Sequence, residues 1–153
     1  MIDTGLKDKV VLVTGGNHGI GAATAKAFAA QGARVFIHYL RLPLETAAGM
    51  PEAYHVGRAQ SADWIVEAIR ASGGRADAWE CDLADPAAIP ILFDRAEAAL
   101  GPAEVLVNNA AHWEADSFVP GGVEDRPADL WPPRSPNLTP ERHDRHFAVN
   151  SRA

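Results

Sequence analysis

The residues best suited to chemistry in this chain stand in one short segment, residues 14–21, which reads Thr-Gly-Gly-Asn-His-Gly-Ile-Gly. Glycine lets a backbone turn tightly and approach a bulky anion closely. The segment follows the β-branched run 10–13 and leads into the alanine-rich stretch 22–30. A helix beginning here would direct its first amides and its dipole toward a negative charge. The pattern therefore predicts a site for the pyrophosphate of a dinucleotide, with a purely structural glycine turn as the alternative.

Apolar runs and helical patterns alternate along the first two thirds of the chain, and glycines follow the expected helix ends at residues 32, 73–74 and 101. This alternation predicts the α/β class, as a Rossmann-type doubly wound parallel sheet truncated after about four strands, in the order 3-2-1-4. Strands are expected at 10–14, 35–39, 76–81 and 105–108, and helices at 20–31, 61–72 and 86–100. The helix at 86–100 is expected to have Asp85 as its N-cap and Pro86 at its first position. A final helix is expected to follow Thr139, which would be its N-cap.

Two segments interrupt this order. Residues 41–60, which contain prolines and glycines, are expected to be an insertion after the second strand. Residues 112–138 are expected to be a long loop, because prolines and tryptophans follow one another there without a helical or strand pattern. That loop is either a functional element at the ligand-binding edge of the sheet or a mobile linker. Residues 1–153 are otherwise expected to form a single dinucleotide-binding domain that is incomplete at its C-terminus.

Composition narrows the possible partners. The net charge of −6, with acidic residues scattered along the chain, argues against nucleic acid and against an anionic membrane. An apolar signal core and a bilayer-spanning run are both missing from the sequence, which favours a cytoplasmic protein. His143 and His146 share a helix face without a third ligand nearby, so no metal site is expected.

Four motifs in order resemble the short-chain dehydrogenase/reductase family, in its branch with a Thr-Gly-x-x-x-Gly-Ile-Gly fingerprint, and are similar to its 3-oxoacyl-carrier-protein-reductase-like members. The motifs are residues 14–21, 81–83, 107–111 and 147–150, and Ala111 departs from the glycine usual in the family. The resemblance implies contacts with a nicotinamide cofactor along the carboxyl edge of the sheet. The residues concerned are Gly15, Gly16, Asn17, His18, Gly19, Ile20 and Gly21 at the phosphates and ribose, Leu40 and Arg41 after the second strand, Asp82 and Leu83 at the adenine, and Asn109 and Ala110 beside the ribose and nicotinamide.

Charge at the end of the second strand favours NADP over NAD. A carboxylate there would bind the ribose 2′-hydroxyl of NAD, whereas an arginine suits the 2′-phosphate of NADP. The strand is followed by Leu40 and Arg41, with no carboxylate before Glu45. Arg41 and His18 are therefore expected to face the phosphate.

The resemblance also implies an oxidoreductase that transfers hydride to or from a small-molecule carbonyl or alcohol and forms a homo-oligomer as the full-length parent. Asn150 matches the family's catalytic asparagine. Its serine and Tyr-x-x-x-Lys have no match, since Tyr39 ends a strand and Tyr54 is followed four residues later by Arg58. The chain alone is thus expected to be inactive, as the amino-terminal part of a truncated frame or incomplete sequence. A non-catalytic dinucleotide-binding module or a decayed gene product is the alternative.

Overall fold

The computed structural model describes residues 3–43, 52–114, 116 and 137–153. The chain divides into two compact units, Met1–Ala110 and Ala111–Ala153, and each is described by itself. Most of the long loop predicted over residues 112–138 lies outside the described residues. In the part that is described, no helix is long and apolar enough to cross a membrane.

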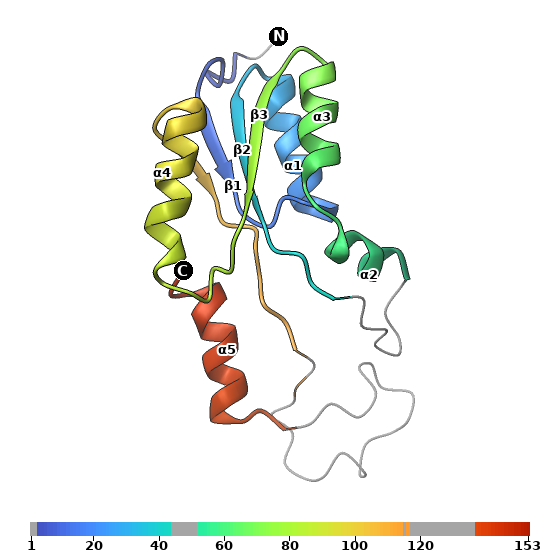
Figure 1. The fold of residues 1–153 in the computed structure, drawn as a ribbon, viewed down its shortest axis with the longest axis vertical. Coiled ribbons are helices and arrows are strands. Elements are labelled where there is room, and N and C mark those ends of the chain that lie inside the picture. Colours follow the sequence, from blue (N-terminus) through green and yellow to red (C-terminus); the bar gives the residue numbers. More distant parts are fainter. Residues whose placement is uncertain (1–2, 44–51, 115, 117–136) are drawn as a thin grey trace. The chain divides into compact units, whose positions relative to one another are not determined.

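The first unit is built on a four-stranded parallel sheet with the order β3-β2-β1-β4 (Figure 1). This confirms the predicted fold class and strand order. Each observed strand begins and ends within one residue of its predicted bounds. Strand β1 is a continuous apolar run, as expected of a strand buried on both faces. The strands are β1 (Val10–Val13), β2 (Arg34–Tyr39), β3 (Arg75–Glu80) and β4 (Val105–Val107).

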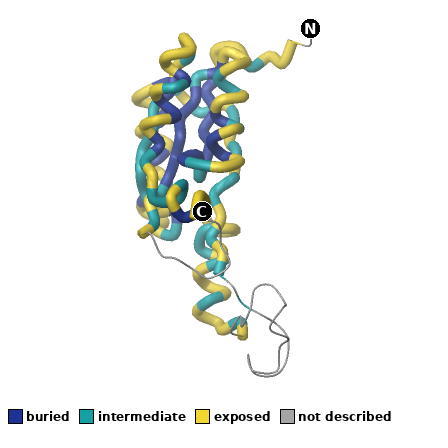
Figure 2. Tube along the Cα trace, turned by 90° about the vertical axis from the view of Figure 1, so that its right-hand side faces the viewer, coloured by how far each residue is buried: buried dark blue, intermediate teal, exposed yellow. Residues whose placement is uncertain are grey.

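Helices cover both faces of this sheet. Helix α1 (Gly19–Ala30) and helix α3 (Asp63–Ala71) pack together on one face, and α4 (Ala88–Leu100) packs against β2 and β3 on the other. Figure 2 shows the buried residues concentrated along the strands between these helices. Because successive side chains of a strand point to opposite faces, β1 and β2 contribute side chains to the core on each face of the sheet. The fully buried strand residues are Val10, Val11, Leu12, Val13, Val35, Phe36 and Ile37.

The start predicted for α4 is wrong by two residues. The helix begins at Ala88 with Ala87 as its N-cap residue, so Pro86 is not its first residue. Asp85 instead closes a turn before the helix. Its side chain accepts a hydrogen bond from the amide of Ala87 at 2.9 Å, and its carbonyl accepts one from the amide of Ala88 at 3.0 Å. The carboxylate thus stabilises the preceding turn.

Helix α2 (Glu52–Ala59) lies within the predicted insertion and was not expected from the sequence. It lies beyond the carboxyl ends of the strands (Figure 1). A segment this short, with Gly57 inside it, has little intrinsic tendency to form a helix. Contacts with the glycine-rich turn supply the missing stabilisation, as described below.

The second unit contains α5 (Pro140–Asn150). Thr139 is its N-cap as predicted, because its side chain accepts a hydrogen bond from the amide of Arg142 at 3.3 Å. Pro140 occupies the first turn, where its missing amide hydrogen costs nothing, and Glu141 adds a negative charge near the helix dipole's positive end.

Candidate functional site

Thr14 fixes the turn that follows β1. The residue is buried, and its hydroxyl donates to the carbonyl of Val107 at 3.2 Å. The same oxygen accepts hydrogen bonds from the amides of Asn109 and Ala110, each at 3.0 Å. The Asn109 side chain then donates to the carbonyls of Thr14 and Gly15, both at 2.9 Å. Five hydrogen bonds that involve side chains therefore join the end of β1 to the end of β4.

The glycines of the turn are required by the close approach of its own backbone. A Cβ on Gly21 would lie 2.2 Å from the carbonyl oxygen of Gly15 and 2.6 Å from Nδ2 of Asn109. A Cβ on Gly15 would lie 2.8 Å from the Cα of Ala110, and Gly15 also has a φ of +63°. Any larger residue at either position would separate α1 from β4 or distort the turn.

Helix α1 begins without the groups that usually satisfy a helix N-terminus. His18 is the N-cap residue, but its side chain makes no capping hydrogen bond, and the first turn holds no acidic residue. Ile20 in that turn is 79% exposed, and a Cβ on Gly19 would meet nothing within 4 Å. An open helix N-terminus with unneutralised amides suits a phosphate. The residues of the turn therefore fit the phosphate portion of a dinucleotide.

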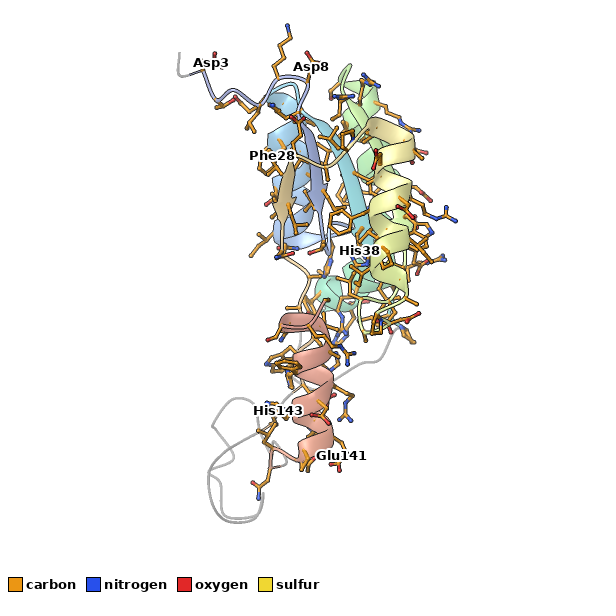
Figure 3. The ribbon with its side chains drawn as sticks, turned by 90° about the vertical axis from the view of Figure 1, so that its left-hand side faces the viewer. Asp3, Asp8, Phe28, His38, Glu141 and His143 are labelled. Carbon is orange, nitrogen blue, oxygen red and sulfur yellow. The ribbon has the colours of Figure 1, made fainter. Side chains whose placement is uncertain are left out.

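His38 lies directly beneath the turn, at the carboxyl end of β2 (Figure 3). Its Nδ1 accepts a hydrogen bond from the amide of Gly15 at 3.3 Å, and its Nε2 lies 2.9 Å from the carbonyl of Cys81. These partners assign a neutral ring that carries its hydrogen on Nε2. Burial lowers the pKa of His38 below the ordinary value of 6.5, against weaker opposing effects of the Cys81 carbonyl and Asp82.

Acid is expected to destabilise the turn through His38. Because the pKa of His38 is lower in the folded protein, the unfolded chain takes up more protons once the pH falls below about 6.5. The contribution is fully present above that pH and is lost as the pH falls toward the folded value. Urea unfolding between about pH 7.5 and 5.5 should show this decline in the free energy of unfolding. His38→Asn should make the free energy depend less steeply on pH, by the equivalent of up to about one bound proton. An unchanged slope would show that His38 does not carry it.

Arg41 does not stand alone after β2. Its guanidinium is in an ion pair with Glu80, with Nη2 2.6 Å from Oε2, and its amide donates to Oε1 at 2.9 Å. This pairing raises the pKa of Arg41 and lowers that of Glu80, chiefly through the side-chain hydrogen bond between them. A carboxylate therefore offsets the charge of the arginine that the sequence places near a 2′-phosphate. Leu40, the residue before it, is half-buried.

Asp82 and Leu83 follow β3 at the same edge of the sheet. Asp82 is exposed, and its carboxylate accepts a hydrogen bond from the amide of Ala84 at 2.8 Å. Leu83 is buried. The fold thus brings the residues predicted after β1, β2, β3 and β4 in the first unit to one edge of the sheet, where open α/β sheets bind ligands.

Sequence reasoning missed the residues that hold the turn from the side of α2 and α3. Asn17 is buried, and its Nδ2 donates to the carbonyls of Gly57 at 3.4 Å and Gln60 at 2.9 Å. The indole of Trp64 donates to the carbonyl of Asn17 at 3.2 Å. Asn17, predicted as a cofactor contact, therefore also serves as the attachment point of α2. No periodicity in the insertion signals these contacts.

Asn150 belongs to the second unit, at the end of α5. Its side-chain oxygen accepts from the amide of His112 at 2.8 Å, and its Nδ2 donates to the carbonyl of His112 at 3.0 Å. The side chain of Asn150 therefore both accepts from and donates to the backbone of His112, as the backbone of a neighbouring strand would. In this arrangement the residue fixes the segment that begins at Ala111.

Ion pairs hold the same segment against α5. Glu114 contacts the guanidinium of Arg145 through both carboxylate oxygens and lies 2.9 Å from Nε2 of His112. The hydrogen bond from Arg145 is the main reason that the pKa of Glu114 falls to about 2. His146 lies 3.3 Å from Asp116. Among the described residues, no group of three or more side chains is arranged to hold a metal ion.

The sequence matches the family model described as "short chain dehydrogenase" over residues 9–150. Elsinochrome reductase 1 of Elsinoe fawcettii is 35% identical over 147 residues, which are 96% of this chain and 43% of the relative. An uncharacterised oxidoreductase of Mycobacterium bovis is 37% identical over 110 residues, or 71% of this chain and 28% of the relative. The chain thus spans less than half the length of either curated relative.

A solved structure has the same arrangement of elements. It is a short chain dehydrogenase from Burkholderia cenocepacia in complex with NADP, with a TM-score of 0.66 and 36% sequence identity. The match covers 96% of this chain and 46% of that one. A family model that matches nearly the whole sequence, joined to the same fold, identifies this chain as a member of the short-chain dehydrogenase/reductase family of oxidoreductases.

Proposed function

We propose that this chain binds NADP(H) and forms the cofactor-binding part of an oxidoreductase acting on a small carbonyl or alcohol. The observation that carries the proposal is the turn after β1. Five hydrogen bonds around Thr14 and Asn109 fix its shape, and α1 begins there with uncapped amides. The NADP in the related Burkholderia cenocepacia structure supports the choice of cofactor.

The residues of this chain would bind and orient the cofactor. The amides at the start of α1 would hold its phosphates, and the exposed carboxylate of Asp82 would accept a hydrogen bond from the exocyclic amine of adenine. Asn109 and Ala110 would lie beside the nicotinamide end, because β4 is the strand next to β1. When bound, the cofactor supplies or accepts the hydride. Asn150 would act by positioning the segment after β4.

Neither of the two tyrosines in the sequence is assigned here as the proton donor for the carbonyl oxygen. Hydride transfer to a carbonyl needs an acid of matched pKa within hydrogen-bond reach. Tyr39 is buried at the end of β2, and burial is the main cause that raises its pKa. Tyr54 belongs to α2, and its ring lies 5.7 Å from that of His18. The proposal therefore assigns cofactor binding to this chain and expects no turnover from it alone.

Calorimetric titration of the chain with NADPH and NADH tests the binding half of the proposal. Saturable binding of NADPH, with weaker binding of NADH, is expected. A panel of aldehydes and ketones with either cofactor tests the second half, and no turnover is expected. Failure to bind either nucleotide would overturn the proposal. Turnover that is lost in Tyr54→Phe or Tyr39→Phe would show that the chain carries its own acid.

The expected setting belongs to the same proposal. A cytoplasmic location and a homo-oligomer of the full-length parent follow from the sequence-based expectations given above.

A non-catalytic module that only binds the dinucleotide is the second candidate. It would need only the turn after β1 and the residues around it. NADPH binding by the chain, together with a parent reading frame that lacks a Tyr-x-x-x-Lys sequence, would decide for it.

A further inference from the structure

The inserted helix α2 lies against the phosphate-binding turn through its backbone. A Cβ on Gly57 would lie 3.0 Å from Cδ2 of His18 and 3.1 Å from its Cβ, so the helix approaches His18 as closely as glycine permits. Asn17 holds this approach in place through the carbonyls of Gly57 and Gln60. The contact is therefore built into the fold of the first unit.

This approach brings a second basic residue, Arg58, to the turn. Its guanidinium lies 5.3 Å from the ring centroid of Tyr54, and the ring of Tyr54 lies 5.7 Å from that of His18. Arg58 is near enough that its positive charge, after burial, contributes to lowering the pKa of His18. Two groups that can carry positive charge are thus close enough to repel each other, as expected where an anion is to be bound.

The backbone of Arg58 fixes where along the cofactor this pair would act. Its carbonyl accepts a hydrogen bond from the amide of Leu42 at 3.1 Å, which ties the end of α2 to the chain leaving β2. The end of the second strand is where this fold distinguishes the 2′-hydroxyl of NAD from the 2′-phosphate of NADP. Arg58 therefore lies between that position and the turn.

Arg41 and Arg58, the two arginines near this position, differ in whether a carboxylate already neutralises their charge. Arg41 is bonded to Glu80 through its guanidinium and its amide. Arg58 has only the ring of Tyr54 as a charge partner among the described residues. A guanidinium without a carboxylate partner can offer its full charge and its paired donors to a phosphate.

We propose that Arg58, with His18, binds the 2′-phosphate of the adenosine ribose and is the residue that makes this chain select NADP(H) over NAD(H). The proposal rests on the proposed function, because it requires a bound dinucleotide. It assigns to the inserted helix a task that the sequence assigned to Arg41. Arg41 instead fixes the path of the chain after β2 through Glu80.

Calorimetric dissociation constants for NADPH and NADH, measured with the whole chain, test the proposal. Arg58→Gln should weaken NADPH binding by at least about tenfold and change NADH binding by less than about twofold. Arg58→Lys should restore part of the difference, because it keeps the charge but loses the paired donors. Arg95→Gln is the matched control, since Arg95 also lies over an aromatic ring, Trp79 at 4.6 Å, but on α4.

A second variant separates the two arginines. The double substitution Arg41→Gln with Glu80→Gln removes their ion pair without changing the net charge, and it should weaken NADPH binding less than Arg58→Gln does. If the double variant loses as much NADPH affinity as Arg58→Gln, then Arg41 binds the 2′-phosphate and the proposal is overturned. Equal weakening of NADPH and NADH by Arg58→Gln would also overturn it, because that result places Arg58 at the pyrophosphate. If the wild-type chain binds neither nucleotide, the proposed function itself fails.

Discussion

Replacing Gly21 by alanine is expected to abolish NADPH binding and to lower the free energy of unfolding by about 3 kcal/mol. The added Cβ would lie 2.2 Å from the Gly15 carbonyl oxygen and 2.6 Å from Nδ2 of Asn109. Neither atom can yield cheaply. One belongs to the backbone, and the other is held by hydrogen bonds to two carbonyls. Relief of the clash must therefore move α1 away from the turn, which removes the amides from the phosphate site.

Gly19→Ala is the matched control, because Gly19 lies in the same turn without the close approach. A Cβ there would meet nothing within 4 Å, although a φ of +53° strains any other residue. Its expected cost is about 1 kcal/mol, the cost of the left-handed backbone conformation. Urea unfolding of both variants measures the difference. Equal losses would show that the close approach of α1 to Asn109 costs no more than the strained backbone at Gly19.

The sheet could be predicted from the sequence because its signals are strong and local. Strand β1 is apolar throughout and buried throughout, and glycines close α1, α3 and α4 where the chain turns back. Gly32 and Gly73 both have a φ of +83°, the left-handed conformation that a helix end favours. Parallel strands joined by helices then leave few orders open. The order 3-2-1-4 was predicted as the one expected of a doubly wound sheet.

The surroundings of the turn could not be predicted, because they depend on contacts between segments far apart in sequence. Asn17 meets Gln60 across 43 residues, and Arg41 meets Glu80 across 39. A pattern read along the chain shows neither the partner that neutralises Arg41 nor the helix that carries Arg58. The resemblance predicts Asn109 as a cofactor contact. Its side chain donates to two backbone carbonyls in the turn after β1, far away in sequence.

Thr14→Val is expected to lower the free energy of unfolding by about 2–4 kcal/mol and to weaken NADPH binding. Valine has nearly the same shape as threonine, so the buried space stays filled. The hydroxyl, however, is the acceptor for the amides of both Asn109 and Ala110. Without it, two amides near a buried position lose their partner, and each such loss costs about 1–3 kcal/mol. The segment after β4 would then shift away from the turn.

Thr14→Ser tests whether the hydroxyl or the methyl group is responsible. Serine keeps the oxygen that accepts both amides and loses one methyl group, which costs about 1 kcal/mol in a buried site. Urea unfolding should therefore place serine between the wild type and valine, and NADPH affinity should be lost only with valine. Should valine prove as stable as serine, the hydrogen bonds at Thr14 would contribute nothing net. The shape of the turn would then come from the close glycine contacts and from the hydrogen bonds of the Asn109 side chain to the carbonyls of Thr14 and Gly15.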